Sequence, residues 1–264
     1  MSQFLSQCGI LSRRHFLPGL GAAVGLPPLG VVRAAEPSSD ASSSDSRRKL
    51  RVVVTGGHPG DPEYGCGGAI ARYTDLGHHV TLIYLNRGDT AETATRPASD
   101  VRVKEAEKAC EILGAHPVFA RQIDGHAIVD AERYEQFRRL LEAEQPDAVF
   151  THWPIDNHRD HRAMSMLVYD AWLKMGRKFA LYYYEVSTGE DTVQFAPTHY
   201  VDISRTQPRK RLACYAHASQ SPDRFYALQE TVTRMRGLES GHKQAEAFIR
   251  HIQNPSIALP PAGE

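Results

Sequence analysis

Residues 50–57 read LRVVVTGG, a β-branched apolar run that stops at two glycines. An apolar run without polar alternation is typical of a parallel strand that is buried on both faces. A helix is predicted after it at 68–76, ending before Gly77, and a second apolar strand, HVTLIYLN, at 79–86. A strand, a helix and a strand in this order indicate the βαβ unit of a parallel sheet.

The same alternation continues through the rest of the chain. Further helices are predicted at 100–113, 131–144, 160–175, 208–220 and 222–239, and further strands near Val118 and at 147–153, 179–186 and 199–203. Strands that alternate with helices of this length indicate one α/β domain, a mostly parallel sheet with helices on both faces. We expect this domain to cover residues 50–254 and to be followed by a loose tail at 255–264.

The residues before the domain carry the pattern of an export signal. Residues 12–17 read SRRHFL and precede a mild apolar stretch at 18–32 and then Arg33-Ala34-Ala35, where small residues suit cleavage. The stretch contains three Pro and four Gly and is shorter than the about 20 apolar residues of a membrane span. We therefore predict a twin-arginine signal at 1–35 rather than a retained anchor or a disordered start.

The Ser-, Asp- and Pro-rich residues 36–49 predict a disordered linker, since almost nothing in them can be buried. We expect the protein to be exported, to the periplasm or outside the cell, with no stable insertion into the membrane once the signal is removed. The twin-arginine route carries folded proteins, often with cofactors in place, and so favours a metal or cofactor here.

Composition excludes several classes of protein. With 41% hydrophobic and 23% charged residues the chain is an ordinary globular one, and its four cysteines form no CxxC pair. Its 31 Lys and Arg balance 31 Asp and Glu. A chain without a basic excess is not expected to bind nucleic acid. Composition leaves the oligomeric state open.

Candidate metal ligands lie in loops that follow strands, where α/β proteins bind ligands. His58 and Asp61 follow the first strand, in a glycine-rich loop that lacks both phosphate-binding fingerprints. The loop THWPIDNHRDHRAM at 151–164 carries five His and Asp side chains, His152, Asp156, His158, Asp160 and His161. Loop polarity alone would explain the first pair, and Asp160 or Asn157 can equally cap the following helix.

If the two loops converge, His58, Asp61 and His161 form a set of two imidazoles and one carboxylate. Three protein ligands leave a fourth position for water, which is the arrangement of a catalytic zinc site. Zinc lowers the pKa of such a water to about 7 and makes it a nucleophile at neutral pH. The reaction class that follows is hydrolysis. The same ligands also accept Fe²⁺, cobalt or nickel.

Substrate contacts are predicted from two further loops. Arg87 and Asp89 follow the second strand in NRGDTAETATRP, and Asp124 follows the third in QIDGHAIVD. These side chains could grip a sugar or a carboxylate, although a solvated run of charges explains them as well.

The chain resembles the LmbE-like, or PIG-L, family of zinc-dependent N-deacetylases. The family is marked by HPDDE before a GCGG-like turn and by HPDH at a later helix; this chain has HPGDPEYGCGG at 58–68 and HRDHRA at 158–163. NRGD, YVDI and AHASQ (216–220) resemble further parts of the family. The resemblance implies a Rossmann-like fold and removal of an acyl group, usually acetyl, from an amino sugar or glycoconjugate by a zinc-bound water.

The resemblance also implies roles for single residues. His58, Asp61 and His161 match the family's zinc ligands. His158 matches the histidine that stabilises the oxyanion or protonates the leaving amine, and Asp160 its charge partner. Arg87 and Asp124 match substrate contacts.

Gly60 departs from the family pattern, because the family has at this position the aspartate that acts as general base. Such a base contributes about 10²- to 10⁴-fold in rate. Glu63, Asp160 or Asp89 are hypothetical substitutes, as is the substrate itself. The alternative is a binding module that holds metal and sugar without catalysis. A nucleotide-binding protein is disfavoured, since the first loop lacks the phosphate fingerprint.

Overall fold

The computed structural model describes residues 48–90, 100–253 and 255. The predicted signal at 1–35, nearly all of the predicted linker and all but one residue of the predicted tail lie outside these residues. At the start of the described part, Arg48 pairs with Asp147 and Lys49 donates to the carbonyl of Leu76. Both residues precede the predicted boundary at Leu50 and contact the domain.

A seven-stranded sheet forms the centre of the domain, with strand order β3-β2-β1-β4-β5-β7-β6. Its first five strands run parallel, and β7 runs antiparallel to both β5 and β6. The strands are β1 (Arg51–Gly56), β2 (His79–Asn86), β3 (His116–Gln122), β4 (Ala148–His152), β5 (Ala180–Tyr184), β6 (His199–Asp202) and β7 (Ala245–Arg250). The predicted α/β fold with a mostly parallel sheet is confirmed.

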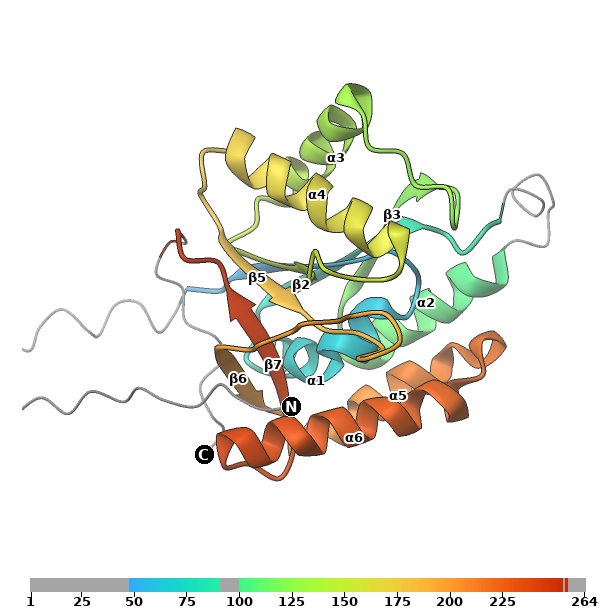
Figure 1. Ribbon diagram of the computed structural model, residues 1–264, viewed down its shortest axis with the longest axis vertical. Helices are drawn as coiled ribbons and strands as arrows, with labels where there is room; N and C mark the ends of the chain where they lie inside the picture. Colours follow the sequence, from blue (N-terminus) through green and yellow to red (C-terminus); the bar gives the residue numbers. More distant parts are fainter. Residues whose placement is uncertain (1–47, 91–99, 254, 256–264) are drawn as a thin grey trace, which may run out of the picture. The chain divides into compact units, whose positions relative to one another are not determined.

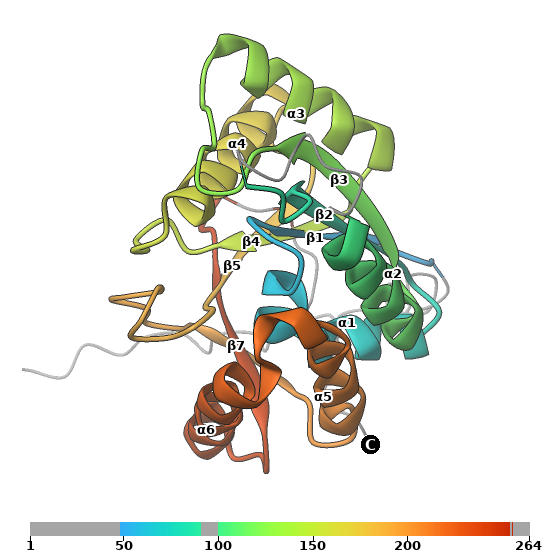
Figure 2. The same ribbon diagram turned by 90° about the vertical axis from the view of Figure 1, so that its right-hand side faces the viewer.

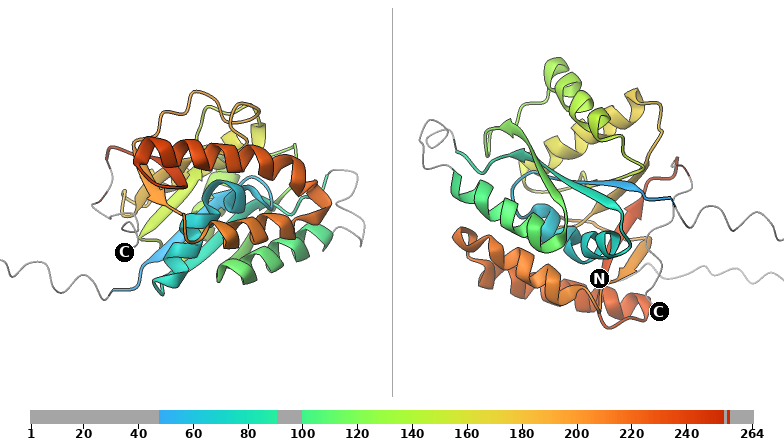
Figure 3. Two further views of the ribbon diagram at one scale, coloured as in Figure 1. Left: turned by 90° about the horizontal axis from the view of Figure 1, so that it is seen from below. Right: turned by 180° about the vertical axis from the view of Figure 1, so that it is seen from behind.

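Helices cover both faces of the sheet (Figures 1 and 2). One face carries α1 (Asp61–Asp75), α2 (Val101–Leu113), α5 (Gln207–Ala216) and α6 (Pro222–Ser240), and the other carries α3 (Ala131–Glu144) and α4 (Arg159–Lys174). Figure 3 shows α5 and α6 side by side on the outside of the larger layer.

The three valines of β1 show why the centre of this strand is a continuous apolar run. Val52 and Val54 pack into the cluster that contains α1 and α2, whereas Val53 packs into the cluster that contains α3 and α4. Both faces of a central parallel strand are buried, so successive residues contribute apolar surface to opposite faces.

The first helix begins earlier than predicted, at Asp61 rather than at residue 68. Its glycines, which read as a loop in the sequence, are places of close packing. A Cβ at Gly65 would lie 2.3 Å from the Tyr184 ring, and one at Gly68 would lie 2.5 Å from Ile203. The helix can approach β5 and the segment after β6 only because these side chains are missing.

The β7 strand, AEAFIR, was not predicted. It inserts between β5 and β6, and the pairing that defines it comes from strands distant in sequence. The predicted helix at 208–220 ends at Ala216, and a 3₁₀ turn follows at Ala218–Gln220. Within the described ranges, no helix has the length and apolar character needed to cross a membrane.

Candidate metal centre

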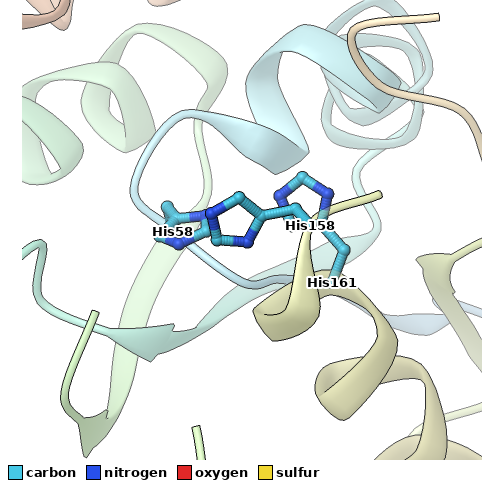
Figure 4. A group of neighbouring side chains, drawn as sticks. All are labelled: His58, His158 and His161. Atoms are coloured by element: carbon cyan, nitrogen blue, oxygen red, sulfur yellow. The ribbon is translucent and has the colours of Figure 1, made fainter. Parts of the chain in front are cut away.

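The candidate site lies at the carboxyl ends of β1 and β4, where the strand order reverses. Chain segments leave these two neighbouring strands toward opposite faces of the sheet, and the crevice between them is where such folds bind ligands. His58 follows β1, Asp61 opens α1, and His158 and His161 lie at the start of α4. Figure 4 shows the three imidazoles close together. The structure thus brings together the two loops that the sequence singled out.

The Asp61 carboxylate lies between two histidines. Its Oδ2 atom is 3.2 Å from Nδ1 of His58 and 3.3 Å from Nε2 of His161. Three sets of donor atoms lie within 4.8 Å of one another, namely His58 with His158 and His161, Asp61 with His152 and His161, and His58 with Asp124 and Asp160. The predicted ligands are spread over the first two sets, which share His161.

Each predicted imidazole ligand is held through its other nitrogen. Nε2 of His58 lies 3.1 Å from Asp124 Oδ1 and 3.2 Å from Asp160 Oδ2. Nδ1 of His161 lies 3.0 Å from Asp156 Oδ1. Metal-bound histidines are oriented in this way, by a carboxylate on the nitrogen that does not bind the metal. The donor set and its supporting carboxylates therefore fit a divalent metal.

The charges of this cluster are strongly coupled. Burial lowers the pKa of His58. The charge of Asp61 and hydrogen bonds with carboxylates raise it by more, so the pKa lies well above its usual value. Burial also lowers the pKa of His161, but the charge of Asp61 and a hydrogen bond with Asp156 outweigh it and raise the pKa to about 9. The pKa of Asp61 is lowered well below its usual range, because both histidines outweigh the effect of burial.

His152, the last residue of β4, packs against the His161 ring. Its ring stacks on that of His161 with centroids 4.0 Å apart, and its Nε2 accepts the N–H of Gly57 at 3.0 Å. Burial and the charge of His161 lower the pKa of His152 to about 4. The ring is therefore neutral. Gly57 also leaves room for His161, since a Cβ there would lie 2.9 Å from the ring.

His158 is the N-cap of α4. Its Nδ1 accepts the backbone N–H of Asp160, and burial together with His58 and His161 lowers its pKa. A neutral ring with an acceptor at Nδ1 carries its proton on Nε2. The carboxylate of Asp160, the predicted charge partner of His158, accepts from the N–H groups of Gly125 and Ala127 and contacts His58. Its charge raises the pKa of His158, although the net shift is downward.

A cavity of about 270 Å³ opens over these groups. Of the predicted site residues, it is lined by His58, Asp61, Asp124, His158 and His161.

The other predicted site residues in the described part of the chain do not line this cavity. Arg87 pairs with Asp100, and Asp89 is 8% exposed. Glu63 is fully buried and accepts from the Tyr84 hydroxyl at 2.7 Å. Asp160 is also fully buried. Their positions do not support Glu63, Asp160 or Asp89 as a substitute for the base.

Three residues that the sequence did not assign belong to the site. Asp156 orients His161, Arg102 lines the cavity and donates to the Asp124 carboxylate at 3.3 Å, and Asp191 also lines it. Asp156 lay in the crowded loop and so carried a signal. Arg102 and Asp191 come from a helix start and from the segment between β5 and β6, and no local motif marks either of them.

Part of the chain matches a known protein family. Residues 53–172 match the family model described as PIG-L, GlcNAc-PI de-N-acetylase. This range is a PIG-L family domain. The matched range contains both histidine motifs and the strands that position them, so the PIG-L pattern and the site coincide.

Three known proteins are similar to most of the chain. The diacetylchitobiose deacetylase of Thermococcus kodakarensis is 27% identical over 79% of this chain and 85% of its own length. The 4-oxalmesaconate hydratase of Pseudomonas putida is 23% identical over 84% of this chain and 93% of its own length. The crystal structure of a conserved protein from Thermus thermophilus has a TM-score of 0.68 at 27% identity and covers 81% of this chain and all of that one.

Proposed function

We propose that the protein is a zinc-dependent hydrolase that removes an N-acetyl group from an amino sugar or glycoconjugate. The observation that carries the proposal is the position of Asp61 between two histidines whose other nitrogens are held by carboxylates, on the wall of an open cavity. A relative named diacetylchitobiose deacetylase supports an acetylated amino sugar as the substrate.

His58, Asp61 and His161 would hold the metal. Bound there, Zn²⁺ would polarise the amide carbonyl and lower the pKa of a coordinated water to about 7. His158 would donate a hydrogen bond from Nε2 to the developing oxyanion. Asp124 and Arg102, which face the cavity from neighbouring elements, would contact the polar groups of the substrate, whereas Arg87 and Asp89 could contact only a longer ligand.

The test combines metal analysis with an assay for free amine, using the purified protein with Zn²⁺ and a panel of N-acetylglucosamine and N,N′-diacetylchitobiose. We expect about one metal per chain and amine release. His161→Ala should lose both metal and activity, whereas His158→Ala should keep the metal and lose activity, which also separates a hydrogen-bond donor from a ligand. The exposed His79, at the opposite end of β2, provides the control variant His79→Ala.

The second candidate function is a binding module that holds metal and sugar without turnover. The observation that favours it is Gly60, which supplies no carboxylate at the position of the family's general base. Stoichiometric metal, binding of an N-acetyl sugar by calorimetry and no released amine would establish this module. Absence of bound metal would contradict both candidates.

We also propose that the protein acts outside the cytoplasm. The support is the SRRHFL motif and the apolar stretch that follows it. Fractionation of cells that express the full chain, compared with an Arg13→Lys, Arg14→Lys variant, tests this: export of the double variant at the wild-type level would refute it.

A further inference from the structure

In the proposed amide hydrolysis, the water proton that Gly60 cannot accept needs another acceptor near the cavity. Among the described residues that line the cavity, three carry carboxylates: Asp61, Asp124 and Asp191. Asp61 lies between His58 and His161, and Asp124 contacts His58 and Arg102. Asp61 is thus engaged with the two proposed metal-binding histidines, and Asp124 with His58 and the Arg102 guanidinium. Asp191 is the remaining carboxylate in the cavity wall.

We propose that Asp191 replaces the missing base and accepts the proton of the attacking water. The inference rests on the amide hydrolysis proposed above. It assigns a catalytic role to a residue on the segment between β5 and β6, far in sequence from both histidine motifs.

The segment that carries Asp191 is tied directly to the metal-binding loop. The carbonyl of Asp191 accepts the N–H of Asn157 at 2.8 Å, and the hydroxyl of the next residue, Thr192, donates to Asp156 Oδ2 at 2.9 Å. Asp156 and Thr192 also form a β-bridge. Since Asp156 holds His161 through its other oxygen, the position of Asp191 is fixed to the same carboxylate that orients a proposed ligand.

The surroundings of Asp191 suit a base. Burial raises the pKa of its carboxyl; the charge of His161 lowers it, and the charges of Asp156 and Asp61 raise it, with a net upward shift. The Ser187 hydroxyl hydrogen-bonds to it. A carboxylate with a raised pKa is the stronger base, and general bases work best when their pKa lies near the working pH.

The proposed step needs only the water, the substrate and the groups that line the cavity. The water oxygen forms a bond to the carbonyl carbon while one of its protons moves to Asp191. The C–N bond then breaks as Asp191 passes that proton to the leaving nitrogen, while Nε2 of His158 keeps its proton and donates a hydrogen bond to the oxyanion. The other water proton stays on the acetic acid, which leaves with the amine, so Asp191 returns to its carboxylate form and neither an oxidant nor a second substrate is needed.

The kinetic test compares Asp191→Asn with the neighbouring Glu190→Gln. Glu190 is exposed, pairs with Arg224 and does not line the cavity, so it controls for charge removal on the same segment. We expect Asp191→Asn to lower kcat by about 10²- to 10⁴-fold, to remove the acidic limb of the pH profile and to keep full metal content. Asp191→Glu should recover part of the rate, and Glu190→Gln should match the wild type. An Asp191→Asn variant with wild-type kcat and pH profile would overturn the proposal.

A second measurement does not depend on turnover. In a crystal structure of the wild-type protein soaked with Zn²⁺, we expect an Asp191 carboxylate oxygen within hydrogen-bond distance, about 3 Å, of an ordered water at the ion. A carboxylate out of reach of that water would overturn the assignment, even if no tested sugar is cleaved. Conversely, failure to release amine from any sugar, with Asp191 at that water, would count against the proposed substrate and not against the base.

Discussion

At the residue scale, identical side chains take different roles because their neighbours differ. His161 has two carboxylates on its ring nitrogens, and its pKa rises to about 9. His152 stacks on the same ring, but its Nε2 accepts a backbone N–H and its pKa falls to about 4. One imidazole is thus suited to bind a cation, and the other stays neutral and fixes the loop before α1.

Asp156 should control metal affinity without touching the metal. Asp156→Asn replaces the carboxylate that holds Nδ1 of His161 with a weaker acceptor, and loss of such an outer partner costs about 10- to 100-fold in metal affinity. Competition with a fluorescent zinc chelator would measure it. Asp75→Asn, exposed at the far end of α1, should leave the affinity unchanged; equal affinities for both variants would contradict the role of Asp156.

Asp191 should lower the stability of the metal-free protein at neutral pH. Its pKa is raised in the folded state, so the ionised form is less favourable there than in the unfolded chain, where a carboxyl titrates at about 3.9. Stability is therefore lost as the pH rises through this range. In chelator, Asp191→Asn should have a higher Tm than wild type at pH 7 and an equal Tm below about pH 4. A difference that does not change with pH would exclude this origin.

At the element scale, α1 carries the site because it lacks side chains where it meets the sheet. Asp61 occupies its first turn, and Gly65 lies one turn later against Tyr184. Tyr184 in turn donates to the Thr55 carbonyl and contacts Nε2 of His152. The spacing of α1 from β5 is therefore coupled to the placement of two groups in the site.

Gly65→Ala tests this coupling. The added methyl group would overlap the Tyr184 ring, and overpacking of this kind costs about 1 to 3 kcal/mol, more than the at most about 1 kcal/mol that alanine gains in a helix. We expect a lower free energy of unfolding in urea and weaker metal binding, because Asp61 moves with the helix. Lys174→Ala, at an exposed position of α4, is the control. An unchanged affinity in the destabilised glycine variant would separate the packing of α1 from the site.

At the scale of the whole molecule, one buried ion pair joins three elements. Lys210 of α5 pairs with Glu246 of β7, and both side chains are almost fully buried. Glu246 also accepts the N–H groups of Gly68 and Ala69 in α1. The antiparallel strand β7 is thus connected to the helical layer that carries Asp61.

Glu246→Gln should destabilise the domain by about 3 to 5 kcal/mol, since it leaves the Lys210 ammonium buried without a counter-charge. Urea unfolding measures the change. The double variant Lys210→Met, Glu246→Gln removes the unpaired charge and should recover much of the loss. Equal destabilisation in the single and double variants would show that the charge of the pair is not the cause.

The sequence by itself determined the α/β fold, the order of the first six strands along the chain and the two histidine loops. These are local properties: apolar runs of strand length, helical periodicity and polar residues directly after buried strands. It also located His58, Asp61, Asp124, His158 and His161, because side chains that follow neighbouring parallel strands meet at one edge of the sheet.

Tertiary structure decided the rest. The β7 strand is defined by pairing with strands far away in sequence, and the helical start of α1 depends on packing against Tyr184 and Ile203. The carboxylate of Asp160 turned to His58, and Asp191 reached the cavity from a segment without a motif. Which side chains line a cavity depends on how segments far apart in the sequence pack together, and a local sequence pattern does not determine that packing.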